Sequence, residues 1–261
     1  KYLGLIQNRV KSQFNRKQIY AAETTQCPFG DRLLLLDLDG NLEQSNSDNL
    51  LLLRETLRAK SGLFKNCIGV LTGRSLQSAR RRFADFNLPL PDVWVTRAGT
   101  EIYYGQEDQE DRFWKSSMVL DWDRKGVEIA LADLKSHLIL QDEIQQAPFK
   151  VSYLLKEPGE EILPLVNNRL TQRGYAASTH LRCHCYLDVL PLRASRTEAI
   201  RHLALRWGLS LDKVFVVASQ QGDAELIQGL TTALVPADHD PCLEGYRSHQ
   251  RVFFASKTNF S

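Results

Sequence analysis

The sequence predicts an α/β fold: a Rossmann-like, mostly parallel sheet with helices on both faces and a smaller inserted α+β unit. Three observations lead to this prediction. Apolar runs of strand length alternate with helix-length segments, and this alternation lapses between residues 113 and 189. The length of 261 residues equals about 1.7 domains at roughly 150 residues per domain, so a large core carrying a smaller insert fits best.

The first thirty residues are expected to form a helical linker. Apolar side chains recur there at helical spacing, at Leu3, Ile6, Val10 and Phe14. Because basic residues predominate, the segment is either a solvated basic helix or a docking helix whose apolar stripe packs on a partner domain. The chain begins with Lys1 rather than Met, which is compatible with a piece of a longer protein.

Residues 31–112 and 190–261 are predicted to build the core. Continuous apolar runs are typical of parallel strands that are buried on both faces. The expected strands cover residues 33–36, 67–71, 93–96, 100–104, 214–217 and 232–235. The expected helices cover residues 48–60, 75–86, 195–207 and 224–230.

Residues 113–189 are predicted to form the inserted α+β unit. Its expected helices cover residues 126–140 and 161–174, and its expected strands cover residues 149–155 and 181–190. The run Cys183-His184-Cys185 would put two thiols on one face of the last strand, and such ligands suit zinc. No second Cys/His pair follows at a suitable spacing, so zinc is the less favoured interpretation.

Composition excludes several classes of function. The 33 basic and 31 acidic residues leave a net charge of +2, far below the one-signed charge of a typical nucleic-acid-binding protein. No apolar run approaches the ~20 residues that span a bilayer, and the first residues show no signal-peptide pattern. Five scattered cysteines favour reduced thiols, so we expect a soluble, cytoplasmic protein.

Two carboxylates follow the first predicted strand, in the order Asp37-Leu38-Asp39-Gly40. In open α/β sheets, ligands bind beyond the carboxyl ends of the strands. Two charges buried there are costly unless a cation or dense hydrogen bonding stabilises them. A divalent metal and a phosphate would explain the pattern, with Asp37 attacking phosphorus and Asp39 protonating the leaving oxygen and then activating water.

The second predicted strand ends in Thr72-Gly73-Arg74-Ser75. A hydroxyl followed by backbone N–H groups that enter a helix is an arrangement that binds phosphate. Together with the two carboxylates, these residues resemble the first two motifs of the haloacid-dehalogenase superfamily of phosphotransferases. The inserted unit resembles the cap of that superfamily, so a core of haloacid-dehalogenase type is implied.

A narrower resemblance covers nearly the whole chain from residue 32 onward. Three segments are similar to sucrose-phosphate phosphatases: 94–103, 150–153 and 188–191. Three others look more like the phosphatase-like C-terminal domain of sucrose-phosphate synthases: 191–196, 199–201 and 206–208. The opening helix resembles the end of the glucosyltransferase domain that precedes it in those enzymes.

The resemblance implies roles for individual residues. These roles are sugar binding by Lys150 and Asp188, phosphate binding by Thr72, Gly73 and Arg196, catalysis by Asp37 and Asp39, and Mg²⁺ binding by Asp37, Asp39 and Asp223. The alternative interpretation of Lys150 and Asp188 is an ordinary charged pair.

Three positions depart from the family pattern. Asn41 stands where Thr is usual, Arg196 where Lys is usual, and Ser219 where the fourth motif has its first acidic metal ligand. Arg differs from Lys in shape and reach. Replacing an anionic ligand by a hydroxyl weakens Mg²⁺ binding by on the order of 1–3 kcal/mol. We therefore expect weak or absent Mg²⁺ binding and a vestigial pair of catalytic carboxylates.

A different register for the fourth motif stays open. Gly222-Asp223 is its Gly-Asp pair in that alternative, although the strand 214–217 would then end five residues too early. The favoured register leaves Asp223 as the remaining acidic ligand and predicts absent or very weak phosphatase activity.

These expectations lead to a non-catalytic, sucrose-phosphatase-like domain of a sucrose-phosphate synthase, with a docking or regulatory role in sucrose biosynthesis. The resemblance implies a parent enzyme that transfers glucose from a nucleotide sugar to fructose 6-phosphate. The implied partners are its glucosyltransferase domain, a separate sucrose phosphatase, and sucrose 6-phosphate as a ligand. The alternatives are an active Mg²⁺-dependent sucrose-6-phosphate phosphatase or another sugar phosphatase with altered metal coordination.

Overall fold

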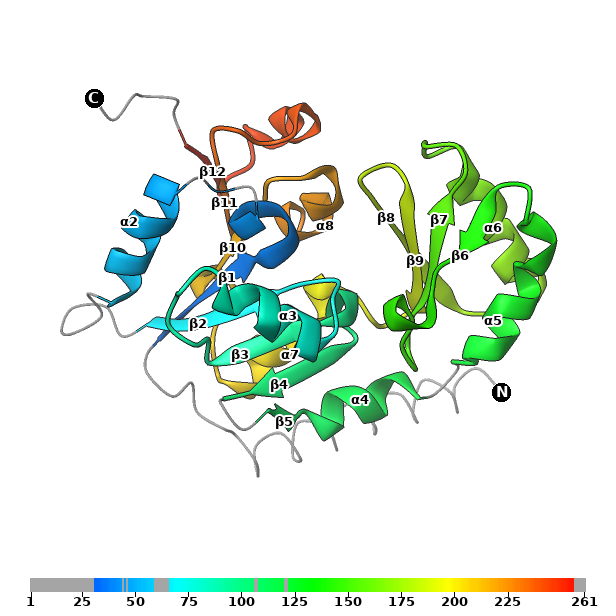
Figure 1. Ribbon diagram of the computed structural model, residues 1–261, viewed down its shortest axis with the longest axis horizontal. Coiled ribbons are helices and arrows are strands. Elements are labelled where there is room, and N and C mark those ends of the chain that lie inside the picture. Colours follow the sequence, from blue (N-terminus) through cyan, green and yellow to red (C-terminus); the bar gives the residue numbers. More distant parts are fainter. Residues whose placement is uncertain are drawn as a thin grey trace, which may run out of the picture.

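The computed structural model describes residues 31–43, 45, 47–58, 66–105, 108–119 and 122–255. The linker helix predicted for residues 1–30 lies outside the described residues. Within them, the strands form two separate sheets, a large one of eight strands and a small one of four (Figure 1). None of the described helices is both long and apolar enough to cross a membrane.

The large sheet has the strand order β12-β11-β10-β1-β2-β3-β4-β5. Six of its strands are parallel: β1 (Arg32–Asp37), β2 (Asn66–Leu71), β3 (Val93–Thr96), β10 (Val214–Val217), β11 (Thr232–Val235) and β12 (Val252–Phe254). The two strands at one edge are antiparallel: β4 (Glu101–Tyr104) and β5 (Gln109–Glu110). Because β2, β1 and β10 are neighbours, the residues that follow them meet at one edge of the sheet.

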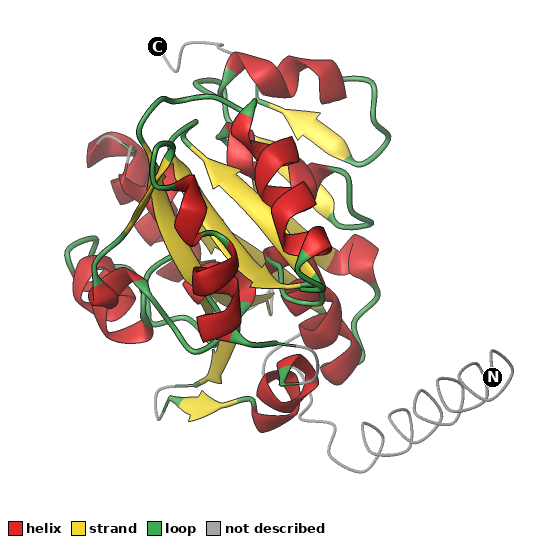
Figure 2. Ribbon diagram, turned by 90° about the vertical axis from the view of Figure 1, so that its right-hand side faces the viewer, coloured by secondary structure: helices red, strands yellow, loops and turns green. Residues whose placement is uncertain are grey.

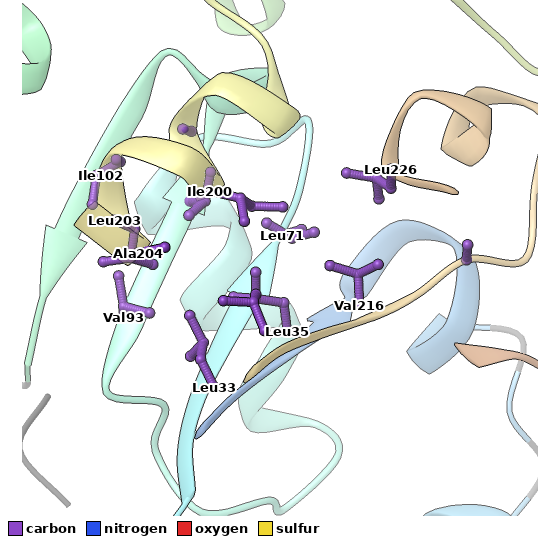
Figure 3. Close-up of a cluster of buried hydrophobic side chains, with 14 of the residues drawn as sticks. Leu33, Leu35, Leu71, Val93, Ile102, Ile200, Leu203, Ala204, Val216 and Leu226 are labelled. Atoms are coloured by element: carbon purple, nitrogen blue, oxygen red, sulfur yellow. The ribbon is translucent and has the colours of Figure 1, made fainter. Parts of the chain in front are cut away.

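The buried side chains of β1 alternate between two apolar layers, as expected for a strand covered on both faces. Leu33 and Leu35 pack with Ile200 and Leu203 in one layer (Figure 3). Leu36 belongs to the other layer. This alternation shows that the large sheet is buried from both sides.

Helices cover both faces of the large sheet. On one face lie α2 (Ser47–Arg58) and α3 (Leu76–Ala84), and on the other α4 (Arg112–Met118), α7 (Arg196–Arg206) and α8 (Ala224–Ile227). Serine side chains cap α3 and α7, because Ser75 accepts from the backbone N–H of Ser78 and Ser195 from that of Glu198. The α/β prediction for this part of the chain is confirmed.

The small sheet has the order β6-β7-β9-β8 and is antiparallel throughout. Its strands are β6 (Leu138–Leu140), β7 (Val151–Leu155), β8 (Ala177–Arg182) and β9 (Tyr186–Pro191). Two helices, α5 (Arg124–Ala130) and α6 (Ile162–Gln172), cover the face that points away from the large sheet (Figure 1). Figure 2, viewed from that side, shows these helices in front of the strands. This second sheet and its helices are consistent with the predicted inserted α+β unit.

Two predictions for the insert are wrong. The helix expected over residues 126–140 ends as α5 at Ala130, a short 3₁₀ turn follows, and residues 138–140 form β6. The strand expected over 181–190 is a hairpin, in which Cys183 and His184 adopt positive φ values of 49° and 56° between β8 and β9. A tight turn at this point cannot be recognised from apolar periodicity alone.

The hairpin also changes the interpretation of Cys183-His184-Cys185, because the two thiols lie in a turn and not on one strand face. Among the described residues, no group of three His, Cys, Asp or Glu side chains is arranged to hold a metal ion. The expectation of reduced cysteines is wrong at Cys67, which is disulfide-bonded, whereas Cys183, Cys185 and Cys242 are free thiols.

Candidate functional site

Asp37 ends β1, and its side chain is 4% exposed. The chain turns sharply after it through a single π-helical turn, Leu38–Leu42, and the Gly40 N–H donates to Asp37 Oδ2 at 2.6 Å. A Cβ on Gly40 would lie 2.4 Å from that oxygen and 2.9 Å from Ser219 Oγ. The turn therefore requires glycine because the two neighbouring side chains approach its backbone so closely.

Asp39 accepts hydrogen bonds from the residues that follow β2. Its Oδ2 accepts from Thr72 Oγ1 and from the Gly73 N–H, both at 2.8 Å, and its Oδ1 accepts from Arg74 Nε at 2.7 Å. The groups predicted to bind phosphate thus stand beside the second carboxylate, as the shared edge of β1 and β2 predicts. In this arrangement Thr72 and Gly73 donate to Asp39.

Arg196 begins α7 with its side chain buried, 8% of the residue being exposed. Its Nη1 donates to Asp223 Oδ1 at 2.8 Å, its Nε to Glu225 Oε1 at 3.0 Å, and its Nη2 to the Gly222 carbonyl. The other oxygen of Asp223, Oδ2, accepts the backbone N–H groups of Ser219 at 2.8 Å and Gln220 at 2.9 Å. Both oxygens of this carboxylate are therefore bound by N–H donors.

The surroundings of Asp37 disfavour its charged form. Burial and the negative charge of Asp223 raise the pKa of Asp37 to about 8, although the positive charge of Arg196 acts in the opposite direction. With no cation other than Arg196 acting on it, the neutral form of this carboxyl group is therefore favoured.

The three carboxylates of the predicted magnesium site do not form an open set of cation ligands. The oxygens of Asp39 and Asp223 already accept hydrogen bonds, and the cation nearest to Asp223 is the guanidinium of Arg196. Ser219, which follows β10, contributes a buried hydroxyl oxygen that has no hydrogen-bond partner among the described residues. Mg²⁺ takes near-octahedral oxygen coordination and is usually held by one or two carboxylates together with waters, so an ion at this site would compete with the hydrogen bonds of Asp39 and Asp223.

Lys150, which directly precedes β7, faces Asp188 on β9. Lys150 Nζ lies 3.3 Å from Asp188 Oδ1, and the two residues are 1% and 0% exposed. Ser152 Oγ donates to the same oxygen at 2.6 Å. The Lys150 ammonium also reaches the Gly73 carbonyl at 3.5 Å, so it links the small sheet to the end of β2.

Arg182 was not singled out by the sequence, yet it joins this pair. Its Nε and Nη2 lie 3.3 Å and 3.1 Å from Asp188 Oδ2. Burial opposes the charge of Asp188, but Arg182 and Lys150 outweigh it and hold the pKa of Asp188 at about 2. The sequence contains no signal for Arg182, because its importance arises from the hairpin that brings the end of β8 to Gly73.

Two connected cavities lie between the small sheet and the edge of the large one. The narrow cavity, about 20 Å³, is lined by Asp37, Asp39 and Asp223, and the broad cavity, about 270 Å³, by His180, Glu225 and others. They share four lining residues: Ala98, Arg182, Arg196 and Gly222. Since one water molecule needs about 10–15 Å³, the narrow cavity has room for about one water and not for a phosphate group.

The sequence profile of the sucrose-6F-phosphate phosphohydrolase family matches residues 30–261. The chain belongs to this family. It is 30% identical over 174 residues to sucrose-phosphatase 1 of Nicotiana tabacum, and the alignment covers 66% of this chain and 41% of that protein. It is 27% identical over 158 residues to a probable sucrose-phosphate synthase 1 of Craterostigma plantagineum, and that alignment covers 51% of this chain and 14% of that protein. The chain thus spans less than half the length of these relatives.

Two solved structures share the fold of this chain. The sucrose-phosphatase of Synechocystis, solved in complex with sucrose and phosphate, gives a TM-score of 0.77 at 24% identity and covers 87% of this chain and 92% of its own. A haloacid-dehalogenase-like hydrolase of Bacillus subtilis gives a TM-score of 0.59 at 16% identity, covering 86% and 87% of the two chains. The predicted core of haloacid-dehalogenase type is confirmed.

The sequence analysis of this member of the sucrose-6F-phosphate phosphohydrolase family singled out Arg196 and Ser219, but it missed Glu225 and His180. Glu225 Oε1 accepts from Arg196, and Glu225 Oε2 lies 3.4 Å from His180 Nδ1. No motif marks these two residues, since they meet only when β8 lies beside α8.

Proposed function

We propose that this chain is a non-catalytic, sucrose-phosphatase-like domain of a sucrose-phosphate synthase, with a docking or regulatory role in sucrose biosynthesis. The observation that carries the proposal is the ion pair between Arg196 and Asp223. In this pair, Arg196 binds the carboxylate of Asp223, which the family resemblance assigns to Mg²⁺. Ser219 supplies a neutral hydroxyl at the neighbouring ligand position.

Phosphoryl transfer at this site would need two conditions. The nucleophile must carry its negative charge, and a cation must offset the repulsion between that charge and the incoming phosphate. Burial and the charge of Asp223 raise the pKa of Asp37 and disfavour its charged form, and the carboxylates of Asp39 and Asp223 already accept hydrogen bonds. The narrow cavity in front of Asp37 is also too small for a phosphate group. All three observations argue against turnover.

Incubation with sucrose 6-phosphate and Mg²⁺ tests the proposal. We expect the purified chain to release no phosphate above a no-protein control, with a genuine sucrose phosphatase run alongside as the positive control. Turnover near 1 s⁻¹ or above, the usual range for enzymes, would contradict it.

The docking role has its own support and its own test. The synthases that match are much longer than this chain, which covers 14–16% of those from Craterostigma plantagineum and Solanum tuberosum. The partners we propose are the glucosyltransferase part of such a synthase and a separate sucrose phosphatase, with sucrose 6-phosphate as a ligand. Size-exclusion chromatography of the chain with each protein should show a complex with at least one of them, and elution of all components as separate peaks would argue against docking.

The second candidate is a working Mg²⁺-dependent sucrose-6-phosphate phosphatase. Asp37 and Asp39 favour it, because they stand at the end of β1 with Thr72 beside them, as phosphoryl transfer requires. The same phosphate-release assay separates the two candidates.

A further inference from the structure

Polar contacts hold the small-sheet unit, residues 122–191, against the large-sheet unit, which comprises the described residues before 122 and after 191. None of the contacts in the following list pairs two opposite charges. They are Lys150 with the Gly73 carbonyl, Arg97 with the Ile144 carbonyl, Ser178 with the Ala194 carbonyl, Cys183 with Gln220, and Glu160 with Gln221.

The contact between His180 and Glu225 is different, because it is an ion pair when the imidazole is protonated. His180 Nδ1 lies 3.4 Å from Glu225 Oε2, and the two side chains are 24% and 25% exposed. His180 belongs to β8, the outer strand of the small sheet on the side of the large-sheet unit, and Glu225 belongs to α8 (Figure 1). The other ion pairs of the small-sheet unit stay within it, so among the described residues this pair alone joins the two units.

Beside this pair the two units approach each other closely. The carbonyl oxygen of Leu181 lies 3.7 Å from the place that a Cβ on Gly222 would take, and Cγ of Arg182 lies 3.2 Å from it. The outer edge of β8 therefore rests on the segment between β10 and α8. Backbone groups on that edge are shielded from solvent by the large-sheet unit for as long as the two units stay docked.

The charged side chains around His180 come from both units. Those that line the broad cavity together with it are Glu160, Arg182, Asp188, Arg196 and Glu225. Asp188 and Arg196 have further ion-pair partners in Lys150 and Asp223. This set contains four carboxylates and three cations, and a protonated His180 adds the fourth positive charge.

The imidazole is the member of the pair that titrates near neutral pH. Burial opposes the charge of Glu225, but His180 and Arg196 outweigh it and hold the pKa of Glu225 at about 2, so this group stays a carboxylate. Histidine side chains in general change their charge between about pH 5 and pH 8. His180 Nε2 lies 3.1 Å from Ser178 Oγ, so the charged ring can donate from both nitrogens, to Glu225 and to Ser178.

We infer that His180 and Glu225 form a pH-sensitive latch between the small-sheet unit and the large-sheet unit. Below neutral pH, the charged imidazole attracts the carboxylate and the two units stay docked. As the pH rises, the ring loses its proton and the electrostatic attraction with it, so the undocked population increases. The inference goes beyond the proposed function, because it concerns how the two units are held together and not whether phosphate is released.

Hydrogen–deuterium exchange, followed by mass spectrometry, tests the latch. The chain is compared at about pH 6 and pH 8, and the rates are corrected for the intrinsic effect of pH on exchange. Peptides within residues 178–184 and 219–225, which meet at the boundary, should be about two- to fivefold less protected at the higher pH, as expected for one partly exposed ion pair. Peptides from β7, which lies inside the small sheet, should be equally protected at both values. Boundary peptides whose protection is unchanged or higher at pH 8 would overturn the inference.

Variants assign the effect to the imidazole of His180. His180→Gln retains hydrogen-bonding groups but carries no charge, so its boundary peptides should show at pH 6 the lower protection that the wild type shows at pH 8. His180→Arg carries a permanent charge and should keep the higher protection at both pH values. The matched control is His137→Gln, which changes an exposed histidine of the same unit and should retain the pH dependence of the wild type. Wild-type pH dependence in His180→Gln would count decisively against the latch.

Salt provides a test that needs no variant. Because both side chains of the pair are partly exposed, about 0.5 M NaCl should screen their attraction and lower the protection at pH 6 towards the value at pH 8. The same salt should have little effect at pH 8, where the latch is already weakened. If the boundary peptides at pH 6 do not respond to salt, an ion pair does not hold the two units together and the inference is wrong.

Discussion

Arg196 Nη1 donates to Asp223 Oδ1 at 2.8 Å, and both side chains are almost completely buried. The pair puts a fixed cation of the chain beside a carboxylate that the sequence predicts as a metal ligand. Because Arg196 also donates to the half-buried Glu225, one guanidinium offsets two carboxylates. The first two predictions follow from this arrangement.

Restoring the family residues should restore metal binding. In the double variant Arg196→Lys/Ser219→Asp, the Lys ammonium group would make fewer contacts with Asp223 than the guanidinium does. The new carboxylate at position 219 would stand beside that of Asp223. We expect Mg²⁺ to bind about tenfold more tightly or better than to the wild type, measured by calorimetry. The matched control is Arg201→Lys/Ser210→Asp, which changes the same residue types outside the site. Equal Mg²⁺ affinity of wild type and double variant would contradict the prediction.

Removing the guanidinium should destabilise the fold. Arg196→Met leaves Asp223 and Glu225 without their buried cation, and breaking such a pair costs about 3–5 kcal/mol. Urea unfolding, followed by far-ultraviolet circular dichroism, measures the change in the free energy of unfolding. Arg201→Met, in which the arginine is exposed and paired with Glu198, should change it by less than about 0.5 kcal/mol. Similar values for the two variants would show that the buried pair contributes little.

Gly40 should tolerate no side chain. A Cβ there would lie 2.4 Å from Asp37 Oδ2, so Gly40→Ala must displace either the carboxyl group or the turn after β1. We expect a loss of about 1–3 kcal/mol in unfolding free energy, as for other overpacked sites. Gly245→Ala is the control, since a Cβ at that position has no atom within 4 Å. If the thermal unfolding midpoints of the two variants coincide, the close approach at Gly40 is not energetically important.

Asp111 should make stability dependent on acid pH. Burial opposes its charge, but His202, Tyr104 and the Trp114 N–H interact with the carboxylate and lower its pKa from 3.8 to about 2. Because the folded-state pKa is the lower one, the unfolded state binds the proton first. The stabilisation is therefore complete above about pH 5 and is lost as the pH falls towards 2.

The variant Asp111→Asn isolates this contribution. The difference in unfolding free energy between wild type and variant should shrink by on the order of 2 kcal/mol between pH 6 and pH 2, as the shift of about two pKa units requires. Asp212→Asn serves as an exposed control that should show a much smaller change. A difference that is constant with pH would mean that Asp111 does not titrate in this range.

Much of the large sheet could be predicted from the sequence, because its strands are short continuous apolar runs with helices between them. Residues 93–96, 214–217 and 232–235 were predicted with the observed bounds. The insert was harder, since β6 carries exposed apolar residues such as Ile139 and Leu140 and reads as the end of the preceding helix. The strand β12 was missed because only three residues pair there.

The candidate site, too, could be predicted only in part from the sequence. Asp37, Asp39, Thr72 and Gly73 were found because they follow neighbouring strands. In the structure Thr72 and Gly73 donate to Asp39, and Asp37 lines the same narrow cavity as Asp39 and Gly73. The pairing of Arg196 with Asp223 and Glu225 could not be found, because it depends on how α7 packs against residues 221–227. Arg182, like Asp188, belongs to the small sheet, whereas Asp37 and Thr72 follow strands of the large one.

The amino-acid sequence by itself determined the class of fold and the edge of the sheet where the candidate site lies, and it predicts three positions at which this chain departs from the family pattern. It did so because strand periodicity and residue type are local properties. Only the tertiary structure decided which charges are neighbours in a buried, low-dielectric space. Ion pairing in such a space depends on distances between segments far apart in the chain, and those distances make Arg196 the partner of Asp223 and bring Arg182 to the same cavity.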